Sequence, residues 1–161
     1  SIGNGYPISA IIGKKKIMQA SQETFISSTM WTDRLGFIAS IKTLKKLKEL
    51  KVNKIISNYG KKIKSGWEKI AKKNNLEITI SGIDAIPSFK FNYKNHLKIS
   101  TYYTQEMLKK GFLFKNTVYL SIHHTDKLID RFISSLDNIF ASLKKNKVRN
   151  IKSLNDFKRM N

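Results

Sequence analysis

Cysteine is absent from this sequence of 161 residues, which excludes disulfides, thiolate metal sites and cysteine nucleophiles. Histidine is scarce: only His96, His123 and His124 occur, so a histidine-based metal site would also need carboxylates. No apolar run approaches the roughly 18–20 residues that a membrane span requires. The first 13 residues also lack the basic start of a signal peptide. We therefore expect no metal site, no membrane contact and a cytoplasmic location.

Acidic residues are few, with 11 against 31 basic residues, and the net charge is +20. Such a charge attracts polyanions, which makes a small basic nucleic-acid-binding module one interpretation. Arginine, whose planar fork suits phosphates and base edges, occurs only four times, and the lysines are spread along predicted helical faces. We favour solvated lysine faces and expect no nucleic acid as a partner. The basic module remains the alternative from another functional class.

The common catalytic signatures are also missing. The sequence has no Gly-x-Ser-x-Gly nucleophile elbow, no Gly-x4-Gly-Lys-Ser nucleotide-binding motif and no His-Glu-x-x-His zinc-protease motif. Two local clusters remain as candidates. Ser27-Ser28-Thr29 precedes a predicted helix; such hydroxyls usually cap helices, and the alternative is a phosphate-binding loop. His123-His124 ends a predicted strand, where a structural role and a place beside an active site both remain open.

The amino-terminal residues predict short, mixed elements. Residues 3–7 contain two glycines and a proline, which indicate a turn. The apolar run 8–12 predicts a buried strand that would need partner strands from elsewhere, and residues 14–21 could form helical turns. Residues 24–29 read as a loop.

Apolar residues then recur at three-residue steps from Leu35 to Leu50, which predicts a long amphipathic helix. Its N-cap is expected at Thr32 or Asp33, and Val52-Asn53 should break it. A second helix with one apolar face should follow and end at Asn74-Asn75. That face consists of Ile55, Tyr59, Ile63, Trp67 and Ile70.

The remaining chain predicts an α+β unit. Alternation of apolar and polar residues favours strands at residues 76–80, 89–93 and 118–122. A helix is expected over 100–110, with Gly111 just beyond its end, and another over 126–145, with Thr125 as N-cap. The elements suggest three parts: residues 1–57, which are not self-sufficient, a compact unit over 58–146, and a polar tail over 147–161.

Four stretches together resemble the class III pyridoxal-phosphate aminotransferases of fold type I, and most of all their glutamate-1-semialdehyde aminomutase group. Near the start these are GNGYPISA at residues 3–10 and TFISST at 24–29. Nearer the end they are QEMLKKGF at 105–112 and SIHHTDKLID at 121–130. The resemblance covers residues 1–143 and rests on the order and spacing of the stretches.

The resemblance implies an α/β fold, with residues 1–57 ending the large domain and residues 58–146 forming the α+β small domain. The implied cofactor is pyridoxal 5′-phosphate (PLP), held by a catalytic lysine as a Schiff base. In the family pattern that lysine stands immediately before Ser1, so we expect the chain to be a C-terminal fragment that is inactive alone. The family also implies a homodimer and a small-molecule amino donor and acceptor.

The same resemblance assigns roles to single residues. Thr29 matches the threonine that reaches the cofactor phosphate of the other subunit, and Ser28 lies beside it. Gly3 and Gly5 match the tight turn after the lysine. His124 and Thr125 match a family motif to which we assign no chemical role.

One departure affects the expected substrate. Many family members continue after the threonine with a Gly-Asn-Pro-like stretch, whereas residues 30–35 read MWTDRL. Trp31 and Arg34 are bulky enough to reshape a substrate pocket or subunit interface. A transaminase acting on another substrate, such as an amino sugar, is therefore the alternative to the aminomutase.

Overall fold

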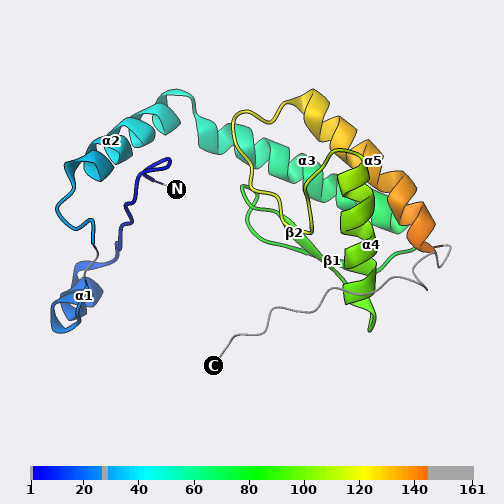
Figure 1. Ribbon diagram of the computed structural model, residues 1–161, viewed down its shortest axis with the longest axis horizontal. Coiled ribbons are helices and arrows are strands. Elements are labelled where there is room, and N and C mark those ends of the chain that lie inside the picture. The colour runs from blue at the N-terminus through cyan, green and yellow to red at the C-terminus, as the bar shows by residue number, and fades with distance from the viewer. Residues whose placement is uncertain (1, 27–28, 145–161) are drawn as a thin grey trace. The chain divides into compact units, whose positions relative to one another are not determined.

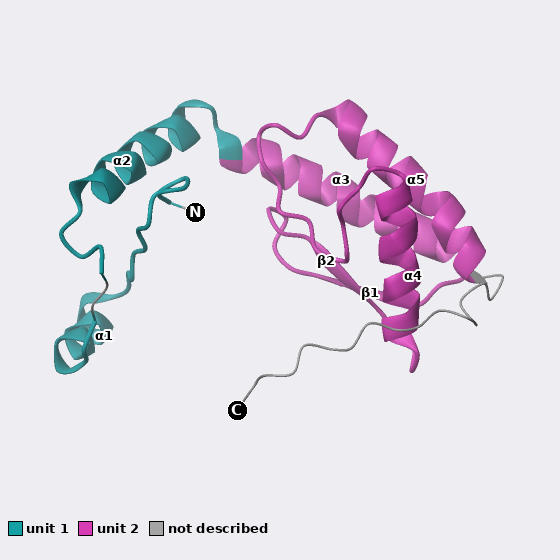
Figure 2. Ribbon diagram, in the orientation of Figure 1, with its two compact units in different colours: residues 1–52 teal, residues 53–161 magenta. Residues whose placement is uncertain are grey.

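The computed structural model describes residues 2–26 and 29–144, and Figure 1 labels their helices and strands. They belong to two compact units, residues 1–52 and residues 53–161, which Figure 2 shows in different colours. None of the helices among the described residues combines the length and hydropathy of a membrane span. The predicted tail over 147–161 lies outside the described residues.

The first unit begins with the tight turn that its glycines predict. Tyr6 donates its N–H to the carbonyl of Gly3 at 3.2 Å. Asn4 and Gly5 lie between these two residues and have φ angles of 47° and 108°, a region that asparagine and glycine occupy at the lowest energetic cost. Gly3 is buried, and a Cβ on it would meet the Ile8 side chain at 2.7 Å.

The predicted strand at residues 8–12 is wrong. The segment is irregular, and Ile11 and Ile12 are 65% and 89% exposed. A strand needs a neighbour to pair its N–H and C=O groups, and the described residues of the first unit contain no other strand. Apolar composition suggested burial, but it could not supply that neighbour.

Two helical regions complete the first unit. α1 spans Lys15–Met18 and continues into a 3₁₀ turn, η1, at Gln19–Glu23, which confirms the predicted helical turns. α2 spans Arg34–Glu49. Asp33 is its N-cap, because its Oδ1 accepts from the Leu35 N–H at 2.9 Å.

α2 packs on the amino-terminal segment through its small residues. Gly36 and Ser40 are buried, and a Cβ on Gly36 would lie 3.2 Å from Ile8 Cβ. The apolar stripe that predicted the helix is left largely uncovered. The stripe residues Leu35, Ile38, Ile41 and Leu44 are at least half exposed, and so is Phe37 beside them.

The break after α2 falls at Lys51, one residue before the predicted Val52-Asn53. Lys51 has a φ of 49°, and α3 begins at once, spanning Val52–Lys73. α3 ends where predicted, since Asn75 has a φ of 53° and Leu76 donates to the Ala71 carbonyl at 2.9 Å.

The second unit contains a two-stranded antiparallel sheet. β1, Ile78–Ser81, pairs with β2, Ser88–Phe91, in the register Ile78↔Phe91 and Ile80↔Phe89. Both strands lie at predicted positions.

The predicted third strand at residues 118–122 is irregular, although the chain does run beside β2. Val118 donates to the Pro87 carbonyl at 3.0 Å, and Leu120 donates to the Ala85 carbonyl at 3.2 Å. Pro87 has no N–H to donate in return, so the ladder cannot be completed there. A single bridge, Ser88↔Thr117, remains.

Two further helices close the second unit. α4 spans His96–Lys109, starting before the predicted residue 100, and Gly111 follows it with a φ of 82°, as its predicted role requires. α5 spans Asp126–Lys144, and Thr125 Oγ1 caps it by accepting from the Leu128 N–H at 3.2 Å.

The core of the second unit is rich in aromatic rings. Phe89 lies at its centre, with ring centroids 4.9 Å from Trp67 and 5.5 Å from Tyr103. Burial raises the pKa of the Tyr103 hydroxyl well above its ordinary value. The other large, fully buried side chains are Ile63, Pro87, Met107, Ile129, Leu136 and Phe140.

Ion pairs join α3 to α5, which lie side by side in Figure 1. Lys62 Nζ is 2.9 Å from Asp126 and 2.8 Å from Asp130, and Lys73 Nζ is 2.6 Å from Asp137. The hydrogen bond from Lys73 holds the pKa of Asp137 below its ordinary value of 3.8, with help from Asn74.

This shift predicts a pH dependence. A carboxyl group whose folded pKa is lowered stabilises the protein above its unfolded pKa, and the stabilisation is lost as pH falls toward the folded pKa. Wild type should therefore be more stable than Asp137→Asn at neutral pH, and the difference should shrink as the pH falls below the ordinary carboxyl pKa of 3.8. Urea midpoints of both proteins, measured across this range, check it; a difference that does not change with pH would contradict it.

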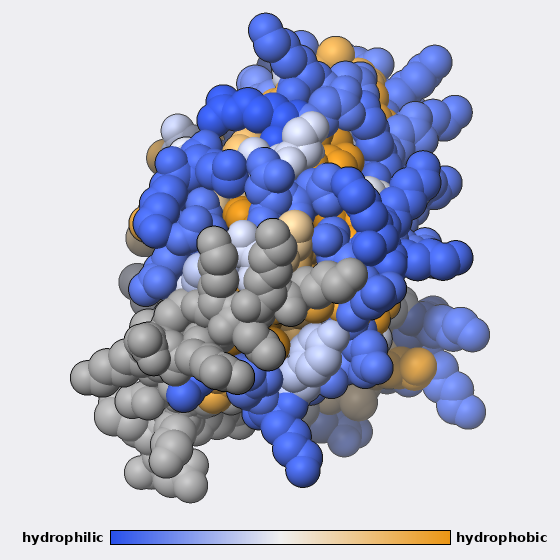
Figure 3. Space-filling model, turned by 90° about the vertical axis from the view of Figure 1, so that its right-hand side faces the viewer, coloured by the Kyte–Doolittle hydropathy of each residue, from blue (hydrophilic) through white to orange (hydrophobic). Residues whose placement is uncertain are grey.

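The face shown in Figure 3 is mostly hydrophilic, with hydrophobic residues in small separate patches.

Candidate functional site

Thr29, the predicted phosphate ligand, lies in the loop just ahead of α2. It is exposed, and its side chain makes no hydrogen bond with the other described residues. Ser28, the second candidate, lies outside the described residues, as does Ser27. The loop turns into the helix through a hydrogen bond from the Asp33 N–H to the Met30 carbonyl at 3.2 Å.

The amino end of α2 is already capped by a carboxylate. Asp33 accepts the Leu35 N–H, so an anion bound here would meet the negative charge of Asp33 rather than a free helix end. Thr29 stands outside that cap, and its hydroxyl makes no hydrogen bond to the other described residues. Of these two features, Thr29 remains the candidate phosphate ligand, and the helix terminus does not.

A hollow lies next to this loop within the first unit. Its volume is about 480 Å³, and most of its lining is apolar. The irregular segment contributes Ile8 and Ile11, and the loop contributes Met30 and Trp31, which is 59% exposed. Gly36 has no side chain, so the backbone of α2 forms part of the wall of this hollow. Sequence reasoning missed this hollow because it depends on residues 8–12 being irregular.

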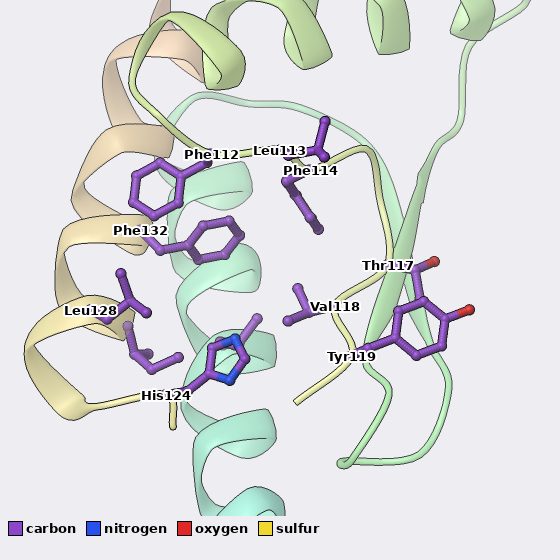
Figure 4. A pocket seen from close by; sticks show the side chains of 11 residues that line it. Phe112, Leu113, Phe114, Thr117, Val118, Tyr119, His124, Leu128 and Phe132 are labelled. Atoms are coloured by element: carbon purple, nitrogen blue, oxygen red, sulfur yellow. The ribbon is translucent and has the colours of Figure 1, made fainter. Parts of the chain in front are cut away.

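His124 lines a second cavity, which lies in the second unit and is shown in Figure 4. Its Nδ1 accepts from the Ser121 N–H at 3.1 Å. The Ser121 carbonyl oxygen also lies 3.3 Å from Nδ1. The contact with the N–H is the shorter of the two, and on that ground we assign Nδ1 as the acceptor and Nε2 as the N–H donor of the ring. His123 is exposed, and its backbone N–H donates to Ser121 Oγ at 3.3 Å. The two neighbouring histidines therefore have different surroundings, which their sequence could not show.

Among residues 2–26 and 29–144, no three potential ligands are close enough together to hold a metal ion.

Gly3 and Gly5 form the turn that the resemblance required of them, in the same unit as Thr29.

Comparison with known proteins identifies the family. The sequence profile described as "Aminotransferase class-III" matches residues 1–140. This chain belongs to the class III aminotransferase family. The match includes all four stretches that carried the resemblance, and it extends over both units.

Three curated relatives are similarly distant from this family member. The 3-aminobutyryl-CoA aminotransferase of Cloacimonas acidaminovorans (strain Evry) is 29% identical over 110 residues, covering 65% of this chain and 27% of the relative. The aminopentol aminotransferase of Sphingopyxis macrogoltabida is 27% identical over 108 residues, covering 67% of this chain and 26% of the relative. The glutamate-1-semialdehyde 2,1-aminomutase of Clostridium botulinum (strain Alaska E43 / Type E3) is 27% identical over 128 residues, covering 69% of this chain and 30% of the relative. The aminomutase group is therefore not favoured over the aminotransferases, and the chain spans less than a third of each relative.

A solved structure supports the fold. It is the PLP internal aldimine form of the FumI protein of Sphingopyxis sp. MTA144, which matches with a TM-score of 0.75 and 24% identity. The match covers 92% of this chain and 36% of that one. The predicted fold class is confirmed: the chain has the fold of part of a fold type I aminotransferase.

Proposed function

We propose that residues 1–161 are part of a PLP-dependent aminotransferase that moves an amino group between small-molecule donors and acceptors. The family match over residues 1–140 carries this proposal. In such an enzyme, residues 1–57 end the cofactor-binding domain and continue into its connecting helix. Residues 58–146 form the small domain.

PLP, when bound, withdraws electrons from the substrate carbon that bears the amino group. Within this chain we assign the phosphate of PLP to Thr29 and Ser28. Exposure of Thr29, and the absence of a hydrogen bond from it to the other described residues, support the assignment. We further propose that the Schiff-base lysine is none of the lysines of residues 1–161, so that these residues alone are inactive.

The exposed apolar surface of the first unit supports a larger assembly. Ile12, Phe25 and Trp31 are all more than half exposed, as is much of the α2 stripe. Apolar surface of this extent on a small unit is typical of a surface that other protein covers. We propose that the rest of the enzyme and a second, identical subunit cover it, and that Thr29 serves the cofactor of that second subunit.

The substrate remains a choice between two classes. One is a transaminase substrate, including an amino sugar; the other is the internal amino transfer of a semialdehyde by an aminomutase. The Met30–Leu35 departure supports the transaminase, while the similar identities of the aminotransferase and aminomutase relatives favour neither class.

A half-reaction tests this proposal. The full-length protein loaded with PLP should convert the cofactor to pyridoxamine phosphate when an amino donor is added without an acceptor. The change is followed by absorbance and confirmed by chromatography of the released cofactor. If none of a panel of amino acids, ω-amines and amino sugars brings about conversion, although PLP is bound, the aminotransferase proposal fails.

A further inference from the structure

The second unit contains a cavity of about 310 Å³ that no part of the proposed function uses. It lies between the segment that follows α4 and the start of α5. Ile63, Ile129 and Phe132 are almost fully buried at its base, while Leu113 and Tyr119 are 91% and 74% exposed. The cavity is therefore open to solvent on one side and closed by buried side chains on the other.

Packing fixes the walls of this cavity. The Phe132 ring lies 4.9 Å from Phe114 and 5.5 Å from Phe112, measured between centroids. Arg131 lies over the outer Phe112 ring at 4.9 Å and donates to the Lys110 carbonyl at 3.0 Å. The cavity is therefore built from ordered side chains rather than left by a loose loop.

One polar ring points into this apolar space. Figure 4 shows the imidazole of His124 directed into the cavity, with Leu128 on one side and Val118 on the other. The Ser121 N–H engages Nδ1, so the ring offers an Nε2–H donor. No lining residue is acidic, so the site offers nothing to balance the charge of an ammonium group.

We infer that this cavity binds a small apolar molecule that carries one oxygen acceptor, such as an aryl-alkyl ketone, with its oxygen accepting the His124 Nε2–H. An apolar cavity of this size with a single well-oriented polar group is the usual form of a small-molecule site. The inference stands on the second unit alone and does not depend on the proposed function.

Two neutral probes of the same shape test the inference: 4-phenyl-2-butanone, which has the acceptor, and butylbenzene, which lacks it. Each is titrated into the full-length protein, observed by NMR. Saturable shifts should centre on Val118, Leu128 and Phe132, and the ketone should show intermolecular NOEs to the Val118 methyl groups. Absence of saturable shifts at these residues for the ketone overturns the inference, whatever the behaviour of any variant.

Two variants separate the polar and apolar contributions. His124→Phe keeps the ring but removes the donor, so it should weaken ketone binding about 5- to 10-fold and leave butylbenzene unchanged. Val118→Trp should fill the cavity and abolish binding of both probes. Tyr6→Phe, which removes an exposed hydroxyl from the first unit and does not touch the lining of this cavity, is the matched control and should change neither. Equal weakening of both probes by His124→Phe would contradict the hydrogen bond to Nε2.

Discussion

Replacing Trp67 by alanine is expected to lower the free energy of unfolding by about 3–5 kcal/mol. Trp67 is 0% exposed and packs on Phe89 at 4.9 Å and on Phe114 at 6.1 Å between ring centroids. Its removal would leave a cavity at the centre of the core, surrounded by rings that cannot collapse into it. Urea unfolding followed by far-UV circular dichroism measures the loss.

Trp31 provides the matched control, because the sequence has only two tryptophans. Trp31 is 59% exposed within residues 1–161, so in this chain measured alone Trp31→Ala should change the free energy of unfolding by less than about 1 kcal/mol. Equal losses in the two variants would contradict the placement of the core.

A third variant separates the indole N–H from the volume of Trp67. Its Nε1 is buried and makes no hydrogen bond with the other described residues. Trp67→Phe removes that donor while keeping most of the ring. It should therefore cost much less than Trp67→Ala.

Replacing Thr29 by alanine is expected to weaken PLP binding to the full-length enzyme about 10- to 100-fold. A hydrogen bond to a charged group contributes about 1.5–3 kcal/mol, and the proposed partner is a phosphate. Equilibrium dialysis of PLP against the two proteins measures the change.

Two controls make the Thr29 result specific. Thr32→Ala removes another exposed hydroxyl from the same loop and should not change PLP affinity. Pyridoxal, which lacks the phosphate, should bind wild type and Thr29→Ala equally. Weakened pyridoxal binding would show that Thr29 acts through the loop and not through the phosphate.

Local signals in the sequence predicted the element boundaries that depend on one or two residues. Asp33 and Thr125 cap helices because a short side-chain oxygen can accept a nearby backbone N–H, wherever the helix packs. Gly111 follows α4 because it adopts a positive φ without strain. Such features need no knowledge of the tertiary structure.

Strands were harder to predict because they depend on a distant partner. Residues 8–12 have the composition of a buried strand, yet the described part of their unit has no strand to pair with them. Residues 118–122 have a neighbour, but Pro87 interrupts the hydrogen bonding. Periodicity reports which face of a segment is apolar and says nothing about what lies alongside it.

The candidate site divides in the same way. The sequence predicts Thr29 as a site residue through a family pattern, whereas its exposure depends on a loop conformation that no pattern contains. The cavity beside His124 is lined by α3, α5 and residues 112–119, which are far apart in the sequence. Neither the cavity nor the direction of the His124 ring could therefore be predicted from the sequence.

The position of the Schiff-base lysine tests the central proposal most directly. Borohydride reduction of the full-length protein loaded with PLP would fix the cofactor to that lysine, and peptide mass mapping would locate it. We predict one modified lysine, immediately before the position of Ser1 and therefore outside residues 1–161. Modification of any lysine from Lys14 onward, or of none, would contradict the proposed place of this chain in the enzyme.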